Sequence, residues 1–328
     1  MFTDPRWLGV AALLAAASTW GAMFIVSKQM LAYVDPFWFT FIRYAIAGVL
    51  LAALLLPRGA APWRKLRTNA GPLALRGAFG FGVFSVTLLT GLTHTEPAHG
   101  AVIMATTPMT TQLVRWALDG VRPARTTLLT TTLALVGVAS VAGVLSHTSF
   151  ATTSTLQGDA LILASTLAWV WYKRGAALFA HLAIVEYTAL TVVAALPLLA
   201  LGAVFATAFD FASLPSAQDL QTTWHAMIYV GVIASGLAVL AFNYGVRTLG
   251  AVTGTAFLNF VPVSALVIGA ALGKLPTANE LLGAAMVITA LLVHTAASVR
   301  SAKVAAAPKA KPLLAATQLR PAGCRQGR

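Results

Sequence analysis

The chain has 328 residues, of which 58% are hydrophobic and only 9% are charged, and its mean hydropathy is +0.81. Soluble domains carry about a quarter charged residues, so this composition excludes a soluble globular protein. The formal net charge of +13 raises the question of nucleic acid, but the basic residues stand between apolar stretches and in a C-terminal tail, which favours membrane topology instead.

Ten apolar stretches are each long enough to cross a hydrocarbon core, which takes about 20 helical residues. In chain order they cover residues 7–27, 36–56, 72–91, 98–117, 126–145, 156–176, 183–205, 224–246, 251–272 and 278–297. Backbone groups in lipid must be hydrogen-bonded within their own segment, so we expect helices. The first stretch is too long for a signal peptide, and nine more follow it. The sequence therefore predicts an all-α polytopic membrane protein.

Basic residues near membrane spans tend to stay on the cytoplasmic side. With the N-terminus inside, only Lys28 and Lys274 fall on the outer side and Arg43 falls within a span, which leaves 19 of the 22 Lys and Arg residues on the cytoplasmic side. We therefore expect a multi-pass inner-membrane protein with both termini cytoplasmic: a short N-terminus, residues 1–6, and a basic, disordered tail, residues 298–328.

An internal repeat divides the chain. Four residues recur after an interval of 154 residues: Gly82 and Gly236, Gly91 and Gly245, Gly100 and Gly254, Pro108 and Pro262. We place the two repeats at residues 7–145 and 156–297, joined by a periplasmic linker at 146–155. Each repeat holds five spans, so the second is inverted relative to the first. Inverted repeats are a recurrent plan of secondary transporters, with the substrate site between the halves.

The repeated prolines fall in the fourth and ninth spans. A proline inside a helix removes a backbone hydrogen bond and bends it, so Pro108 and Pro262 are hinge candidates for alternating access. Membrane helices also tolerate proline without such a role.

Several motifs of the two halves carry a family resemblance. They are Thr19-Trp20-Gly21, Val34-Asp35-Pro36 and Arg43 in the first half, and Ser235-Gly236-Leu237, Asn243-Tyr244-Gly245 and Leu249-Gly250-Ala251 in the second. The chain resembles the EamA-type permeases of the drug/metabolite transporter superfamily from about residue 7 to residue 297. The resemblance implies a ten-helix, exporter-like fold whose cavity is lined by helices one, three, four, six, eight and nine. It implies amino acids, purines, other metabolites or drugs as substrates.

Polar and aromatic side chains within the spans are the substrate-cavity candidates. They are Trp20, Phe24, Arg43, Thr107, Thr111, Trp169, Tyr172, Asn243 and Asn259. An ionised Arg43 needs a partner or a wet cavity, where it would favour an anionic group, unless it extends to the membrane surface instead. The threonines either line the cavity or bond back to their own helix. Aromatic residues near span ends are often interfacial anchors, but Trp20 and Trp169 lie deeper in their runs, at near-equivalent positions.

Three titratable residues near span ends are candidates for proton coupling, namely Glu96, His99 and Glu186. A carboxylate in a poorly solvated site holds its proton more readily and can exchange it during transport. The alternative is that these residues are simply solvated.

The sequence therefore predicts a secondary transporter, an exporter of a small metabolite such as an amino acid, working by alternating access. A channel or a lipid-handling scaffold is the main alternative. An intramembrane enzyme is disfavoured, because Ile233 stands where a Gly-x-Ser-Gly segment around Ser235 needs glycine. Six scattered histidines and one cysteine give no metal-ligand pattern, so we expect no cofactor and no metal. Proton coupling and a homodimer are left open.

Overall fold

The computed structural model describes residues 5–141, 153–179, 181–249 and 257–306, and the secondary structure of these ranges is entirely helical. The helices of the first half are α1 (Pro5–Met30), α2 (Pro36–Leu55), η1 (Leu56–Arg58), α3 (Ala61–Thr68), α4 (Ala70–Gly77), η2 (Ala78–Val83), α5 (Phe84–His94), α6 (Pro97–Met104), α7 (Thr107–Asp119) and α8 (Arg125–Val141). Those of the second half are α9 (Thr153–Leu178), α10 (Ile184–Ala208), α11 (Ala217–Ile228), η3 (Tyr229–Leu237), α12 (Ala238–Leu249), η4 (Phe257–Asn259), α14 (Phe260–Ala271) and α15 (Ala278–Ala306).

Over its described residues, each predicted span falls on one helix or on a short series of helices. The third span comprises α4, η2 and α5, and the eighth comprises α11, η3 and α12. Five helical stretches of the described chain are long and apolar enough to cross a membrane: Arg6–Met30, Pro36–Arg58, Ala70–His94, Val185–Ala208 and Ala217–Leu249. Helix α15 continues to Ala306 and α9 begins at Thr153, so the predicted disordered tail is helical over residues 298–306 and the predicted linker is helical from residue 153. Residues 142–145 of the fifth span, 146–152 of the linker, 251–256 of the ninth span with Gly254, and the tail from residue 307 lie outside the described residues.

Short polar and glycine signals set the helix boundaries. Asp35 caps α2, since its carboxylate accepts a hydrogen bond of 2.9 Å from the backbone N–H of Phe37. Gly120 ends α7 in the left-handed conformation, at a φ of 66°. Thr277 and Glu280 bond reciprocally at the start of α15. These local devices fix where the chain turns between spans.

The fourth span consists of two helices, where a single one was predicted. Helix α6 ends at Met104, and α7 begins at Thr107 with Pro108 in its first turn. Pro262 is likewise the third residue of α14. A proline in the first turn of a helix removes no intrahelical hydrogen bond. Each repeated proline thus starts a helix, and its role as a hinge stays a prediction.

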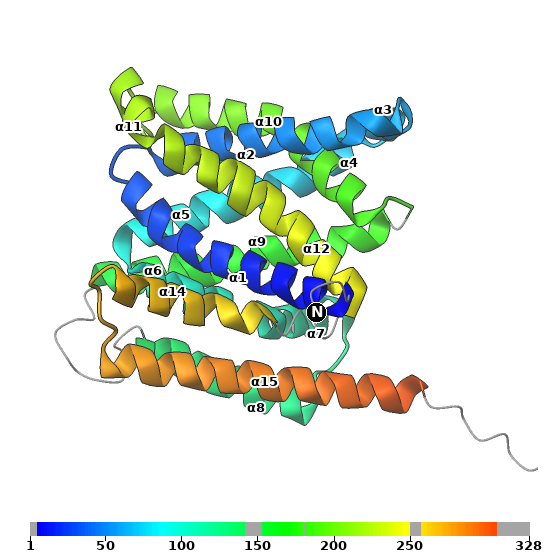
Figure 1. The fold of residues 1–328 in the computed structure, drawn as a ribbon, viewed down its shortest axis with the longest axis vertical. Coiled ribbons are helices and arrows are strands. Elements are labelled where there is room, and N and C mark those ends of the chain that lie inside the picture. The colour runs from blue at the N-terminus through cyan, green and yellow to red at the C-terminus, as the bar shows by residue number, and fades with distance from the viewer. Residues whose placement is uncertain (1–4, 142–152, 180, 250–256, 307–328) are drawn as a thin grey trace, which may run out of the picture.

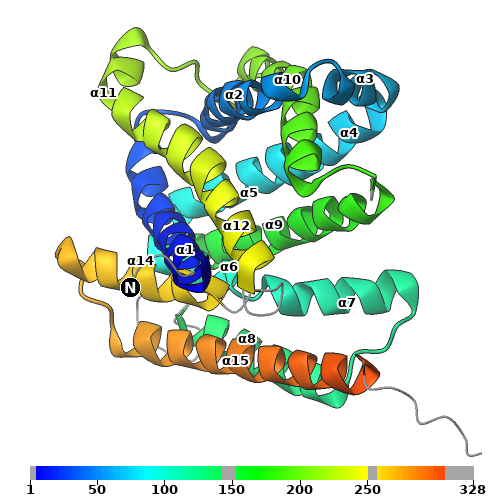
Figure 2. The ribbon, with the colours of Figure 1, turned by 45° about the vertical axis from the view of Figure 1, so that its right-hand side comes forward.

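The helices form a bundle, and most helix axes run roughly horizontally in Figure 1. Helices α8 and α15 lie side by side along one edge, and α2 packs against α10 near the opposite edge (Figures 1 and 2). Between them, α1 packs on α12 and α9 packs on α5. Every one of these pairs joins a helix of the first half to a helix of the second.

The glycines of the repeat make equivalent contacts in the two halves. A Cβ atom on Gly91 would lie 2.6 Å from the carbonyl oxygen of Gly158 in α9, and one on Gly245 would lie 2.9 Å from that of Gly9 in α1. Only glycine permits such close approach of two helices. The pairs Gly9 and Gly158, and Trp20 and Trp169, are each 149 residues apart, so α1 and α9 are equivalent helices.

Two π-helical segments follow the same register. Segment η2, Ala78–Val83, corresponds after 154 residues to 232–237, which is the C-terminal part of η3. π-Helical turns inside α-helices are rare and frequently lie at functional sites. Their recurrence at equivalent positions marks the third and eighth spans as the specialised helices of the bundle.

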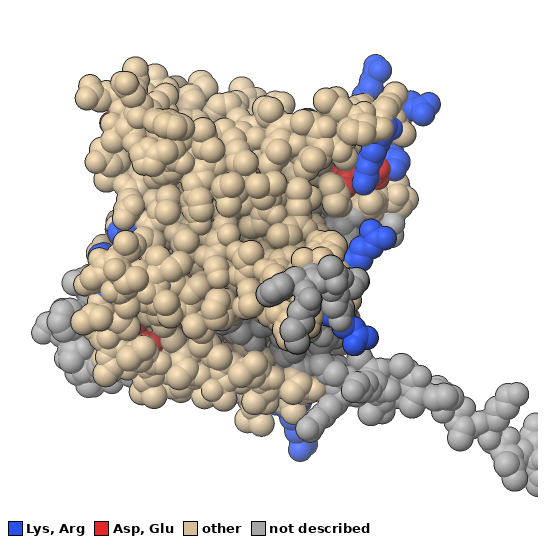
Figure 3. Space-filling view, viewed as in Figure 1, with Lys and Arg blue, Asp and Glu red and all other residues tan. Residues whose placement is uncertain are grey.

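Basic side chains gather at one end of the bundle. Figure 3 shows Lys and Arg mainly at the right-hand end, beyond a broad uncharged face that covers the middle of the molecule. The segment containing α3 contributes Arg64, Lys65 and Arg67 there, and α4 contributes Arg76. This distribution agrees with apolar helices whose charged connections project from one side of a bilayer.

Candidate functional site

Trp20 and Trp169 join the two halves in equivalent ways. The indole N–H of Trp20, in α1, donates a 3.0 Å hydrogen bond to the carbonyl oxygen of Ala234 in η3. The ring of Trp169, in α9, lies 5.1 Å from that of Phe84, the first residue after η2. Each tryptophan therefore contacts the π-helical region of the opposite half.

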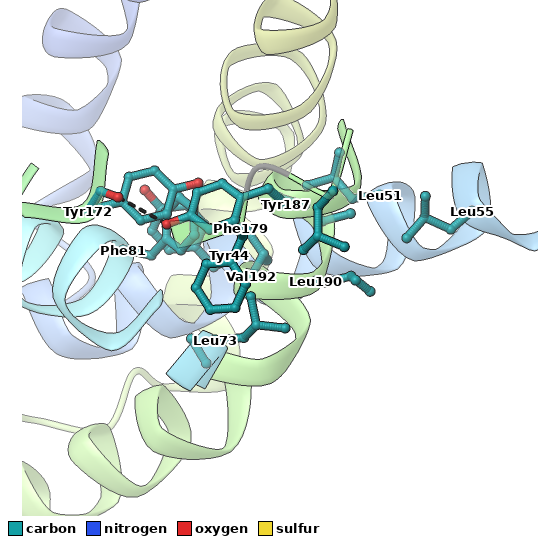
Figure 4. Packing of buried hydrophobic residues seen from close by; sticks show 14 of the residues in the cluster. Tyr44, Leu51, Leu55, Leu73, Phe81, Tyr172, Phe179, Tyr187, Leu190 and Val192 are labelled. Carbon is teal, nitrogen blue, oxygen red and sulfur yellow. Dashed lines mark hydrogen bonds between the residues drawn. The ribbon is translucent and has the colours of Figure 1, made fainter. Parts of the chain in front are cut away.

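An aromatic cluster surrounds Tyr172, one of the predicted cavity residues. The rings of Trp169 and Phe81 lie 5.2 and 4.8 Å from the Tyr172 ring, and Tyr187 stacks on it at 5.3 Å. Figure 4 shows Tyr172 and Tyr187 together with Tyr44 and Phe81, with contributions from α2, η2, α9 and α10. The Tyr187 hydroxyl donates to the carbonyl oxygen of Tyr172 at 3.0 Å. Flat apolar faces and hydroxyl groups thus meet where the halves join.

Arg43 lies in this interior and does not extend to the surface, since it is only 3% exposed. Its Nη2 donates to the hydroxyl of Tyr44, and its guanidinium carbon lies 4.6 Å from the centre of the Tyr44 ring. Its Nε and Nη1 atoms are buried without a hydrogen-bond partner among the described residues. The Arg43 side chain is thus buried within the bundle, and its role in a substrate cavity stays a prediction.

The threonines of the fourth span bond to backbone carbonyl oxygens of the same span. Thr107 donates to the carbonyl oxygen of Met104, and Thr111 donates to that of Thr107 at 2.8 Å. Their neighbours Thr106 and Thr110 line a mainly apolar hollow of about 440 Å³ between α7, α8 and α9. Bonding within the span explains why so many threonines are tolerated here.

The remaining predicted cavity residues are less informative. Phe24 is buried and packs on Gly100, where a Cβ atom would lie 2.9 Å from its ring. Asn243 is half-buried in α12. The side chain of Asn259, like that of the hinge candidate Pro108, lies outside the described residues.

A buried polar network joins three helices at the end of the bundle opposite the basic connections. The Thr95 hydroxyl donates to Asp159 Oδ1 at 2.6 Å, and His99 Nδ1 lies 3.1 Å from Asp159 Oδ2. The other ring nitrogen of His99 lies 3.8 Å from a carboxylate oxygen of Glu280. His99 is 8% exposed and Asp159 is 6% exposed. A histidine thus stands between two carboxylates, linking α6 of the first half to α9 and α15 of the second.

Two lysines complete this end of the molecule. Lys28, at the end of α1, donates to the backbone carbonyls of Leu92, Thr93 and Thr95 at 2.7, 3.0 and 2.8 Å. It therefore satisfies carbonyl groups that the end of α5 leaves free. Lys274 forms an exposed ion pair with Glu96 at 2.9 Å.

Glu186, the third predicted coupling residue, lies at the opposite end in the first turn of α10. Its carboxylate pairs with Arg58 at 3.2 Å and with Lys65 at 2.9 Å. The structure therefore separates the three candidates. Glu96 lies in a surface pair, whereas Glu186 and His99 are both 8% exposed. Glu186 stands between two basic side chains, and His99 stands between two carboxylates.

Sequence reasoning missed Asp159, Thr95 and the role of Lys28. An acidic residue near the start of the predicted sixth span was a signal, because such residues are rare within apolar spans and often functional. Among the described residues, no group of three His, Cys, Asp or Glu side chains is arranged to hold a metal ion.

The inverted halves, the paired glycine contacts and the polar interior define an all-helical membrane transporter built by duplication. The model of the EamA-like transporter family matches residues 7–143 and 156–296, and the chain belongs to this family. It is a family of transporters and not of enzymes, and membership implies a small-molecule substrate and a multi-pass membrane location. The predicted fold class, two inverted five-helix repeats, is confirmed.

Curated relatives and a solved structure agree over most of their lengths. The "Uncharacterized transporter YrdR" of Bacillus subtilis is 28% identical over 293 residues, covering 88% of this chain and 91% of the relative. The "Probable terminal-alkyne amino-acid exporter" of Streptantibioticus cattleyicolor is 26% identical over 295 residues, covering 87% and 92%. A crystal structure with a TM-score of 0.61 and 18% identity covers 91% of this chain and 99% of its own, which shows the shared fold.

Proposed function

We propose that this protein exports a small metabolite of the amino-acid class across the cytoplasmic membrane by alternating access. The observation that carries the proposal is the pair Trp20 and Trp169, each of which lies on the π-helical region of the opposite half. A site made by contacts between two inverted halves can change its side of access when one half rocks against the other. The named exporter among the relatives supports an amino acid as the cargo.

Counterflow in proteoliposomes tests this function. Liposomes holding the purified chain and an unlabelled compound are diluted into a trace of the labelled compound, over a panel of amino acids, nucleosides and cationic drugs. A carrier exchanges the two pools, so label accumulates transiently and with saturation. A channel only equilibrates the label, and a lipid-handling scaffold leaves it outside. Absence of saturable exchange for every compound, with empty liposomes as the control, would overturn the proposal.

We also propose that both termini face the cytoplasm, which makes the His99 end the outer one. The support is the gathering of basic side chains at the opposite end (Figure 3). A green fluorescent protein fused after Arg328 should fluoresce, whereas alkaline phosphatase fused there should be inactive. Active phosphatase would reverse the orientation.

We propose His99, with Asp159, as the site of proton coupling. The support is its burial between two carboxylates on helices of opposite halves, since histidine is the side chain that most readily gains and loses a proton near neutral pH. His99→Gln should abolish acceleration of transport by a pH gradient while leaving counterflow intact. Glu96→Gln is the comparison variant, because Glu96 is exposed. Loss of the gradient effect only in Glu96→Gln would move the coupling site to the surface pair.

A further inference from the structure

The interior guanidinium of Arg43 has no counter-charge within the described chain. Arginine remains charged in proteins and carries five N–H donors but no acceptor. Only Nη2 has a hydrogen-bond partner, the Tyr44 hydroxyl, which is uncharged. Position 43 is about 11 Å along α2 from its first residue, at a rise of about 1.5 Å per residue, so the charge lies well inside the span.

The acidic side chains of the described residues are engaged elsewhere or lie at the surface. Their partners are the backbone N–H of Phe37 for Asp35, Lys274 for Glu96, Arg174 for Asp119, Thr95 and His99 for Asp159, Arg58 and Lys65 for Glu186, Ser216 for Asp219, and Thr277 for Glu280. Asp210 is exposed beyond the end of α10. None of the ion pairs among the described residues includes Arg43. A buried charge needs a partner, and the described part of the fold provides no opposite charge for Arg43.

Buried hydroxyl groups without partners occur on the same helices. They belong to Ser27 in α1, Thr40 in α2, Ser85 in α5 and Ser235 in η3. Helix α2 packs against α5 and η3, and α1 packs against both as well. The elements that meet in the interior around α2 therefore carry unused donors and acceptors together with the unused N–H groups of Arg43.

The second half has no such charge at the equivalent position. A Cβ atom on Gly77 would lie 2.2 Å from the carbonyl oxygen of Thr191, and one on Gly231 would lie 3.2 Å from that of Arg43. Because Gly77 and Gly231 are 154 residues apart, Thr191 is the counterpart of Arg43. The Thr191 hydroxyl bonds to the carbonyl oxygens of Tyr187 and Thr188. At this repeated position, the first half therefore carries a cation without a counter-charge among the described residues, and the second half carries a neutral hydroxyl.

We propose that Arg43 binds the carboxylate of the transported compound, so that the substrate class is a small carboxylic acid such as an amino acid. The planar guanidinium matches a carboxylate with two parallel hydrogen bonds. The proposal rests on the transport function proposed above. It predicts that the carboxylate of the bound substrate neutralises the charge of Arg43. Acids should therefore bind more tightly than their uncharged analogues.

Matched compounds test the proposal in the counterflow assay with the full chain. The probes are L-leucine and L-propargylglycine, their methyl esters, the corresponding amines without the carboxylate, and glucose 6-phosphate. The wild-type protein should exchange the acids, with esters and amines at least about 10-fold weaker, because a hydrogen bond to a charged group is worth about a factor of 10 to 100. Equal exchange of acids and esters, or preference for the phosphate, would overturn the carboxylate assignment.

Variants of Arg43 add a second test. Arg43→Gln should raise the KM for the acid about 10- to 100-fold and remove the preference for acid over ester, whereas Arg43→Lys should retain part of both because it keeps the charge. Arg247→Gln, at an exposed position in α12, is the control and should leave both unchanged. An Arg43→Gln protein that discriminates acid from ester like the wild type would contradict the proposal.

Thermal unfolding in detergent separates this inference from the transport function. L-Leucine or L-propargylglycine should raise the Tm of the wild-type protein while the methyl esters should not, and Arg43→Gln should lose the difference. If wild-type vesicles show no exchange but this acid-specific shift is present, transport is overturned and the carboxylate site stands. If exchange is present but neither acid is favoured in either assay, the site is overturned and transport stands.

Discussion

The two halves of the molecule share their packing but not their polar residues. Gly91 meets Gly158 in the way that Gly245 meets Gly9, and both tryptophans lie on the opposite half's π-helical region. By contrast, Arg43 stands opposite Thr191 in the repeat. Asp159, next to Gly158, stands opposite Val10, next to Gly9. Residues that are the same in both halves form the close helix contacts. Arg43 and Asp159, which differ from their counterparts, are charged residues of the interior.

The largest expected effect comes from breaking a repeated glycine contact. Gly91→Leu and Gly245→Leu should each destabilise the protein by about 3 kcal/mol, the upper end of the usual cost of overpacking, because the opposing backbone cannot move aside. We expect similar losses of Tm and of monodisperse protein from the two variants. Gly202→Leu is the control, since a Cβ atom there meets nothing within 4 Å. A large loss from one glycine of the pair and none from the other would break the symmetry argument.

A smaller effect should follow from removing the acid that departs from the repeat. Asp159→Ala leaves the Thr95 hydroxyl and His99 without their buried acceptor, which should cost about 2 kcal/mol. Val10→Ala, at the equivalent position of α1, is the comparison variant and should cost less, because no polar group loses its partner. Chemical unfolding of the two variants in detergent measures the difference. Equal losses of unfolding free energy in the two variants would mean that the hydrogen bonds of Asp159 contribute no stability beyond side-chain packing.

The two tryptophans allow a finer test. Trp20→Phe loses the hydrogen bond to the Ala234 carbonyl, whereas Trp169→Phe retains an aromatic ring beside Phe84 and Tyr172. The first change should therefore be more destabilising by about 1 kcal/mol. Unfolding midpoints of the two variants check this, and a larger loss from Trp169→Phe would contradict it.

The smallest effect is expected from the surface pair Arg174 and Asp119, whose atoms approach to 2.6 Å. Water and salt screen such an exposed pair, so its contribution to stability is small and Arg174→Gln should scarcely change the Tm at pH 7. The hydrogen bonds from Arg174 hold the pKa of Asp119 below its ordinary value of 3.8. The small stabilisation is thus present above pH 3.8 and is lost only as the pH falls through the lowered pKa. An Arg174→Gln effect whose size changes with pH near neutrality would contradict this assignment.

Local signals predicted the fold, and distant contacts decided the site. Hydropathy located the spans because each helix must bury its own backbone in lipid, and the glycine register revealed the repeat because close helix contacts need small residues. The pairing of His99 with Asp159 joins residues 60 positions apart. The isolation of Arg43 depends on where the other carboxylates lie. Neither feature follows from a local pattern. Sequence reasoning therefore identified His99 and Arg43 as candidates but not the residues around them, and it omitted Asp159.

Several hydrogen bonds between the halves end on main-chain carbonyls. Trp20 donates to Ala234, Tyr229 donates to Thr19 at 2.9 Å, and Arg76 donates to Trp171 at 3.1 Å. A carbonyl acceptor survives any substitution at its own position. These acceptors therefore persist when the side chains at positions 234, 19 and 171 change, although the Trp171 ring also holds Arg76 at 3.7 Å. A duplicated carrier held together in this way can acquire new substrates by point mutation without losing the joint between its halves.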